Sequence, residues 1–300
     1  MIFNAVEIMT PILLAALGGL FAERAGVLNI ALEGLILTGA FAGILIAAAT
    51  ASLLVGMLAG AAAGGLLAVV FAFFSIRLRA NIFITGLAVN LLAAGGIPFV
   101  STWMFGTKGV LRFPQLQRMP RLLEGVTSGI NAVDSLLFGH SVTVYLAWLL
   151  TALAFVVLYR TPFGLRLRAL GAREESVVLA GVDATAYRRL AIVISGIAAG
   201  LGGAAISLRL GVYLPNISAG RGWIALVAIY LGYRHPFGIL MAALLFGFTE
   251  SLAGAAQGLL AIPGTVLLGL PYAITVVAMI VYSALRARGR RHRRLIDSHF

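Results

Sequence analysis

Long apolar stretches constrain this 300-residue chain more than any other feature. The hydrocarbon core of a bilayer is about 30 Å thick, so a helix that crosses it needs ~20 apolar residues. Stretches that approach this length lie at 3 to 20, 34 to 50, 53 to 76, 82 to 100, 141 to 159, 190 to 208, 217 to 233, 237 to 257 and 264 to 285. The sequence therefore predicts an all-α, polytopic transmembrane helix bundle of about 8–10 spans, with room for a broken or re-entrant helix.

Composition excludes several other classes of protein. Hydrophobic residues make up 61% of the chain and charged residues 11%, and the mean hydropathy is +1.04. Soluble domains are roughly half apolar and about a quarter charged, so the bilayer is the main solvent of this chain. The absence of cysteine excludes disulfide scaffolds, thiolate metal sites and iron–sulfur clusters. We expect a single transmembrane domain over residues 1–300, with no metal site.

The net charge of +12 is gathered in short segments. Six arginines lie within residues 160–189 and six more within the tail at 286–300, and Arg77 and Arg79 form a smaller cluster. Short loops rich in arginine are retained in the cytoplasm, so all three segments are predicted to lie inside. The charge then reflects topology, and no nucleic-acid partner is expected. This pattern predicts a multi-pass protein of the plasma (inner) membrane with a cytoplasmic C-terminal tail. The arginines of the tail either bind anionic membrane lipid or merely fix the topology.

Polar residues interrupt the apolar pattern between residues 21 and 34. Glu23, Arg24, Asn29 and Glu33 fall there, and Asn29 and Glu33 would share one face if the piece were helical. One interpretation is an ordinary cytoplasmic turn. The other is a discontinuous helix whose polar break lines a pathway or contacts a partner, because charge at membrane depth is costly.

Two further polar residues lie inside apolar stretches. For Asn90, an interhelical hydrogen bond is the simpler interpretation, worth about 1 kcal/mol or less. Glu250 is harder to explain, since a lone carboxylate in the membrane must be protonated, paired or hydrated. Glu250 therefore supports an alternative function, a proton-coupled secondary transporter that uses Glu250 and Glu33.

The segment 161–183 contains the pattern of a short helix between Gly171 and Gly181. Acidic residues in its first turn suit the positive end of the helix dipole, and Gly181 suits the position just after its end. Such a helix would present Val177, Val178 and Ala180 to something other than lipid. A helix of about two turns is unstable alone, so it needs a receiving surface, which is either the lipid headgroups or a groove in a cytoplasmic protein.

Catalytic signals are missing from the sequence. The single lysine, Lys108, is followed by Gly109, whereas a phosphate-binding P-loop needs Lys followed by Ser or Thr. The chain therefore cannot hydrolyse ATP through that motif, and an ATP-driven system would take its motor from another subunit. An intramembrane enzyme is a further alternative, but no HExxH pair or Ser/His/Asp cluster supports it.

Three ordered motifs, at 13–34, 164–171 and 218–226, resemble the permease subunits of ABC importers of the ribose and branched-chain amino acid type. The similarity is greatest to nucleoside and simple-sugar permeases. One departure follows Gly171, where many relatives have Glu-Asn-Pro and paired alanines and this chain has Ala172, Arg173 and Glu174. The resemblance and the short-helix pattern together place an ATPase-coupling segment on Gly164, Arg166, Arg168, Gly171, Glu174, Val177, Val178, Ala180 and Gly181.

The resemblance implies three protein partners. They are a second permease subunit, homologous or identical, a cytoplasmic ABC ATPase that holds ATP and Mg, and an extracytoplasmic solute-binding protein. Arg209 and Arg221 lie where the binding protein would dock, although charges that merely anchor a helix end are an equal alternative. The solute would be a nucleoside or simple sugar, and the candidate pathway residues are Asn29, Glu33, Asn90 and Glu250.

Overall fold

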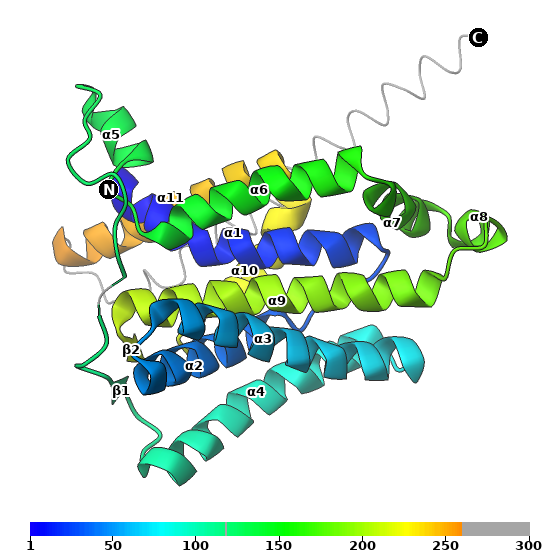
Figure 1. Ribbon diagram of the computed structural model, residues 1–300, viewed down its shortest axis with the longest axis horizontal. Coiled ribbons are helices and arrows are strands. Elements are labelled where there is room, and N and C mark those ends of the chain that lie inside the picture. The colour runs from blue at the N-terminus through cyan, green and yellow to red at the C-terminus, as the bar shows by residue number, and fades with distance from the viewer. Residues whose placement is uncertain (118, 260–300) are drawn as a thin grey trace.

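The computed structural model describes residues 1–117 and 119–259, which form a bundle of helices (Figure 1). One short antiparallel pair of strands, β1 and β2, joins two loops. The helices are α1 (Ile2–Arg24), α2 (Leu32–Thr50), α3 (Leu53–Ala72), the π-helical turn η1 (Phe73–Arg77), α4 (Ile82–Phe105), α5 (Asn131–Leu137), α6 (Val142–Arg160), α7 (Pro162–Ala172), α8 (Glu174–Leu179), α9 (Ala184–Leu210), α10 (Arg221–Leu231) and α11 (Pro236–Leu259), and the strands are β1 (Leu111–Arg112) and β2 (Val212–Tyr213).

The predicted all-α, polytopic bundle is confirmed. Within the described residues, seven helices are long and apolar enough to cross a membrane: α1, α2, α3 with η1, α4, α6, α9 and α11. The predicted span at 217 to 233 is wrong, because the helix there, α10, has only 11 residues. At 1.5 Å per residue it covers roughly half of the hydrocarbon core. The predicted span at 264 to 285 and the tail at 286 to 300 lie outside the described residues.

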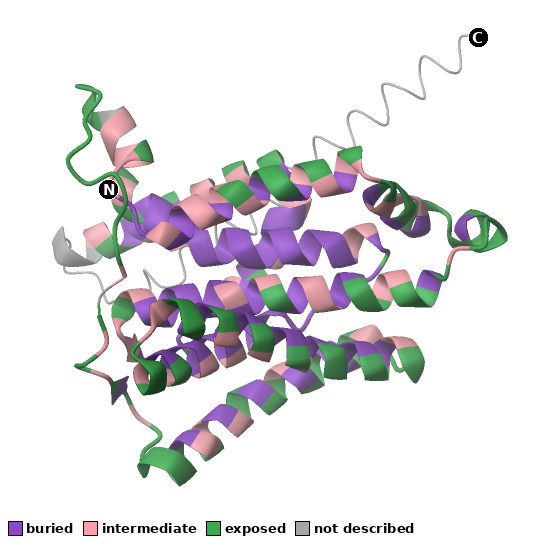
Figure 2. Ribbon diagram, in the orientation of Figure 1, coloured by how far each residue is buried: buried purple, intermediate pink, exposed green. Residues whose placement is uncertain are grey.

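Helix α1 occupies the centre of the bundle. Of its most apolar 18 residues, 94% are buried, compared with 33% in α4 and in α6. It packs against α6, α9, α10 and α11, and Figure 2 shows it almost entirely as buried surface. The outer faces of α4 and α6 carry exposed leucines such as Leu91 and Leu149. These faces are suited to lipid, whereas α1 contacts protein on nearly all sides.

Helices α2, α3 and α9 pack together through small residues. A Cβ atom added at Gly39 would collide with the backbone of Gly200, and one added at Gly64 would collide with the carbonyl oxygen of Gly196. Such close approach of backbones is how helices gain packing energy in lipid, where no hydrophobic force draws them together. The glycines inside these spans therefore serve mainly to pack the bundle.

The two ends of the bundle differ in structure and charge. One end, here called the basic end, carries the C-termini of α1, η1 and α6 together with α7 and α8 (Figure 1). The opposite end carries the N-terminus, α5 and the β1–β2 pair. Two of the three arginine clusters, at residues 77–79 and 160–189, lie at the basic end. The third, in the tail, lies outside the described residues. The prediction that the arginine clusters lie on one side of the membrane therefore holds for the first two clusters.

Candidate functional site

The polar stretch after α1 is a break in the helical structure. Helix α1 ends at Arg24, and α2 begins only at Leu32. Gly26 has a φ of +80°, a backbone conformation that glycine adopts without strain. Residues 25–31, here called the broken segment, connect two separate spans, and Asn29 is buried, so the segment is not an exposed turn. Asn29 lies in the non-helical part, so the condition under which Asn29 and Glu33 would share a helical face is not met.

Two asparagine side chains form hydrogen bonds with backbone groups around this break. The Asn29 amide nitrogen donates to the Ser195 hydroxyl at 2.8 Å, and its carbonyl oxygen accepts from the Ala31 N–H at 3.1 Å. Asn90 in α4 accepts from the Gly34 N–H at 2.8 Å and donates to the Ile30 carbonyl at 2.9 Å. A non-helical backbone within a membrane is tolerated only where its polar groups find partners. Both side chains therefore hold the broken segment in place.

Glu33 joins the break to the half-length helix α10. It lies in the first turn of α2 and is buried. Its carboxylate accepts from the Gly220 N–H at 2.9 Å, from the Gly222 N–H at 2.7 Å and from the Ser218 hydroxyl. A carboxylate is stabilised at a helix N-terminus by unpaired N–H groups and the helix dipole, and here the N-termini of α2 and α10 share one. A Cβ atom at Gly222 would collide with the Glu33 backbone, so only glycine permits this approach.

Arg221 and Glu250 form an ion pair inside the bundle. Arg221 also donates to the carbonyl of Ile217 at 3.2 Å, and its side chain is 14% exposed. The expectation that Arg221 lies free on the outer surface for a docking protein is therefore not met. Glu250 is not a lone carboxylate either, because a guanidinium partner accounts for its place in an apolar helix. We call Asn29, Glu33, Asn90, Ser218, Arg221 and Glu250 the polar junction.

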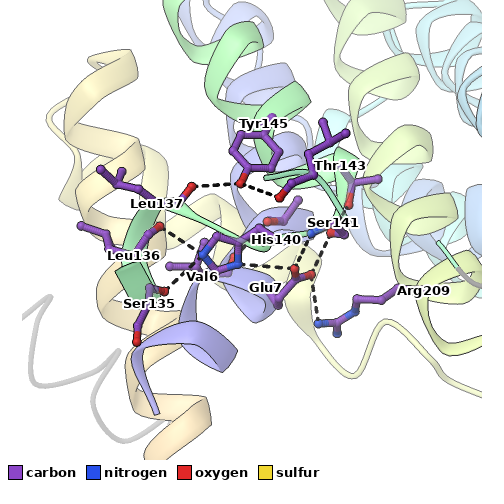
Figure 3. Close-up of polar contacts among 12 residues, drawn as sticks. Val6, Glu7, Ser135, Leu136, Leu137, His140, Ser141, Thr143, Tyr145 and Arg209 are labelled. Carbon is purple, nitrogen blue, oxygen red and sulfur yellow. Dashed lines mark hydrogen bonds and ion pairs between the residues drawn. The ribbon is translucent and has the colours of Figure 1, made fainter. Parts of the chain in front are cut away.

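At the end of the bundle opposite the basic end, Arg209 lies beside a second buried carboxylate (Figure 3). The Glu7 carboxylate is 3.6 Å from the Arg209 guanidinium and 3.5 Å from the His140 ring. It also accepts from the Ser141 N–H at 2.7 Å and from the Ser141 hydroxyl at 2.8 Å. Arg209 borders a polar cavity of about 450 Å³ that Arg121 and Glu124 also line. Arg209, unlike Arg221, thus lines a polar cavity at this end.

At the basic end, α7 packs directly beneath the broken segment. A Cβ atom at Gly171 would collide with the carbonyl oxygen of Arg24, and one at Gly164 would collide with the backbone at the end of α6. Arg166 donates to the Tyr187 hydroxyl at 3.1 Å, and Arg168 lies 4.7 Å from the centre of the Tyr159 ring. These residues fix α7 against α6 and α9.

The short helix expected between Gly171 and Gly181 is present as α8, and Gly181 follows it with a φ of +75°. Its apolar residues face two ways. Val177 is buried against its own chain at 6% exposure, whereas Val178 is 52% and Leu179 89% exposed. The expectation that Val177 is presented outward is therefore wrong. The outward face of α8 consists of Val178, Leu179 and the capping residue Ala180.

Arg188 connects α8 to the broken segment. Its guanidinium donates to the Glu174 carboxylate at 2.7 and 2.8 Å, and its Nε donates to the Ala25 carbonyl at 3.4 Å. The hydrogen bond from Arg188 lowers the pKa of the Glu174 carboxyl below its usual range. Ala25 is the first residue after α1, four residues before Asn29. Arg188 therefore links the first residue of α8 to the chain segment that leads to Asn29.

Comparisons with known proteins decide the family. The chain matches the family described as "Branched-chain amino acid transport system / permease component" over residues 1–285. The chain belongs to this family of ABC permeases. No solved structure matches it.

Relatives of this permease include nucleoside and sugar transporters. It is 34% identical to the guanosine ABC transporter permease protein NupQ of Bacillus subtilis, over 90% of this chain and 87% of that protein. It is 30% identical to the nucleoside ABC transporter permease protein NupC of Lactococcus lactis, over 93% and 90%. A shorter match, at 28% identity, covers 31% of this chain and 28% of the ribose import permease protein RbsC of Bacillus subtilis.

Several residues of the permease's polar sites were not anticipated from sequence. Ser195 and Ser218 complete the hydrogen bonds of the polar junction, and Glu7 and His140 surround Arg209. Each is a polar residue in or next to an apolar stretch, which was the available signal. Arg188 counted only as a topology-setting charge, because its partner Glu174 is 14 residues away in sequence. Within the described residues, no three His, Asp or Glu side chains gather as a metal site would require.

Proposed function

We propose that this permease forms the alternating-access pathway of an ABC importer for a nucleoside or simple sugar, moved by a separate cytoplasmic ATPase. The names of NupQ, NupC and RbsC support this class of solute. The abundance of arginine at the basic end supports a cytoplasmic location for that end and for the C-terminal tail. ATP and Mg would be held by the partner ATPase and not by this chain.

The observation that carries this proposal is the outward face of α8. A six-residue helix has too few internal hydrogen bonds to be stable without packing. Val178 and Leu179 are nonetheless exposed on it, outside the bundle and at its basic end. An apolar knob of this kind fits a groove in a cytoplasmic subunit. Closure of that subunit on ATP would move α8, and Arg188 would carry the movement to the broken segment.

Two further partners complete the proposed importer. A second permease subunit, homologous or identical, would provide the other wall of the pathway. An extracytoplasmic solute-binding protein would dock at the opposite end, where Arg209 and Arg121 border the polar cavity. Carboxylates on the binding protein suit these two guanidinium groups.

The rival proton-coupled transporter has little support in the polar junction. Its two carboxylates are already occupied, Glu250 by Arg221 and Glu33 by three hydrogen-bond donors. Both carboxylates connect helices, since Glu250 joins α11 to α10 and Glu33 joins α2 to α10. A proton carrier must instead bind and release a proton in each cycle. The polar junction therefore favours a static, pinning role for both groups.

Uptake into proteoliposomes tests the proposed function. The permease is reconstituted with its ATPase and its loaded binding protein, and labelled guanosine, ribose and leucine are compared. We expect accumulation of guanosine or ribose that requires ATP and continues when an uncoupler collapses the proton gradient. Accumulation by the permease alone without ATP, or loss of uptake with the uncoupler while ATP is present, would contradict the mechanism. Uptake of leucine alone would contradict the proposed class of solute.

A further inference from the structure

A cavity of about 580 Å³ lies between η1 and the first turns of α9 at the basic end. Its walls are apolar, formed by residues that include Val69, Phe73, Leu190 and Val193, and its rim carries Arg77 and Arg189. Val69, Phe73 and Leu190 are each about half exposed. The cavity therefore combines an open apolar surface with two positive charges.

The cavity exists because α3 and α9 separate towards the basic end. Further into the membrane, Gly64 and Ala68 of α3 contact Gly196 of α9 so closely that no Cβ atom fits at Gly196. At Phe73 the helix turns into the π-helical turn η1, in which the Leu78 N–H bonds back to the Phe73 carbonyl at 3.1 Å. The extra residue in this turn rotates Arg77 back towards the face of Val69 and Phe73. Such turns occur frequently at functional sites.

The two arginines are free to bind a ligand. Among the described residues, neither Arg77 nor Arg189 forms an ion pair or a side-chain hydrogen bond. Other arginines at this end are satisfied within the protein, such as Arg188 by Glu174 and Arg234 by Glu23. Two unpaired guanidinium groups at one cavity attract a phosphate, which they can bind through paired hydrogen bonds.

Depth in the membrane indicates where the phosphate comes from. Helix α9 has 27 residues, so it is roughly 40 Å long and exceeds the ~30 Å hydrocarbon core. Arg189 lies in its second turn and Arg77 is the last residue of η1, which places both at the level of the lipid headgroups. The apolar walls below them lie at the level of the acyl chains. The cavity therefore offers positive charge at the level of a phospholipid headgroup and apolar surface at the level of its acyl chain.

The geometry points to a binding site for an anionic phospholipid, such as phosphatidylglycerol, with its phosphate on Arg77 and Arg189 and an acyl chain on the apolar walls. Basic pockets between transmembrane helices bind anionic headgroups in this way. The lipid would hold η1 and the start of α9 together and so brace the helix that follows α8. This inference does not depend on the transported solute or on the ATPase.

Native mass spectrometry of the full-length permease in detergent tests the site. Phosphatidylglycerol and phosphatidylcholine of equal chain length are titrated against the wild type and the double variant Arg77→Gln, Arg189→Gln. We expect one phosphatidylglycerol to bind in preference to phosphatidylcholine. Loss of each arginine should weaken that binding by about fivefold, hence by roughly 25-fold in the double variant.

A matched double variant, Arg79→Gln with Arg160→Gln, removes the same charge from exposed positions at the same end, outside the cavity. It should leave the affinity within about twofold. An equal loss in both double variants would show diffuse attraction to the basic end and would overturn the site. Displacement of the lipid by inorganic phosphate at a similar concentration would show a headgroup-only anion site and would also overturn it.

A second variant keeps both arginines and fills the cavity. Ala186 lines it and contributes only a backbone N–H to the Asp183 cap, which a larger side chain preserves. Ala186→Phe should therefore reduce phosphatidylglycerol binding at least about tenfold, because the acyl chain loses its apolar surface. Unchanged binding by a monodisperse Ala186→Phe protein would contradict the inference even if the arginine variant failed to fold.

Discussion

Replacing Val178 and Leu179 together by aspartate is expected to abolish co-purification of the permease with its ATPase. These two side chains form the exposed apolar face of α8, and two buried charges without partners are not tolerated at an interface. We expect at least about a 100-fold loss of affinity, since a desolvated unpaired charge costs several kcal/mol. The measurement is pull-down of the ATPase by the tagged permease, followed by ATP-driven uptake, which should fall to background.

The matched control is Leu122→Asp with Leu123→Asp. Both leucines are about half exposed. Leu122 bonds to the backbone of Gly139 and His140, just after α5, at the opposite end of the bundle. This variant should retain the ATPase fully. Retention of the ATPase by the Val178 and Leu179 variant, with the permease intact, would rule out α8 as the docking element. Val177→Asp is not a valid substitute, because Val177 is buried within the permease and the change would damage the fold itself.

Glu33→Ala is expected to be the most destabilising single substitution in the polar junction. It removes the acceptor of the Gly220 and Gly222 N–H groups and of the Ser218 hydroxyl, all in a buried setting. Each buried donor left without a partner costs about 1–3 kcal/mol. The start of α10 should therefore detach from α2. We expect a melting temperature in detergent that is at least about 10 °C below wild type, or no recoverable protein.

Two variants make the Glu33 result interpretable. Glu33→Gln keeps one acceptor oxygen and should give an intermediate loss of stability. Glu124→Ala removes an exposed carboxylate at the opposite end, which should change the free energy of unfolding by no more than about 0.5 kcal/mol. If the Glu33→Ala protein has the same melting temperature as the Glu124→Ala protein, the Glu33 carboxylate does not hold α2 and α10 together. A loss in Glu33→Gln as large as in Glu33→Ala would show that the negative charge is essential.

The helices of the bundle were predictable because hydropathy is a local property of the chain. The stretch at 82 to 100, for example, became α4 (Ile82–Phe105), and the one at 141 to 159 became α6. The break near Gly26 and Asn29 was also visible, since charged and amide side chains between apolar stretches have few structural explanations. The α8 helix followed from its own acidic first turn and from Gly181. Each of these signals is carried by one short, continuous stretch of the chain.

Contacts between distant segments were not predictable in the same way. Glu33 meets Ser218 across 185 residues, and Arg221 meets Glu250 across 29. A single sequence indicates that these charged residues are energetically costly in a membrane. It does not indicate which partners they pair with to reduce that cost. Arg221 was therefore expected on the outer surface, and Glu250 was considered a proton carrier. The prediction of a span at 217 to 233 was wrong for a related reason. Apolarity alone does not distinguish a helix that crosses the membrane from the shorter α10, which starts inside the bundle.

The central position of α1 has a consequence for how the protein is made. Helix α1 leaves the ribosome before α9, α10 and α11, three of the helices that enclose it. A newly inserted α1 therefore waits in lipid, without its final neighbours, for most of the time that translation takes. Biogenesis must end with the late helices closing around an early one, so a stalled or truncated nascent chain would leave the core of the protein open to proteolysis.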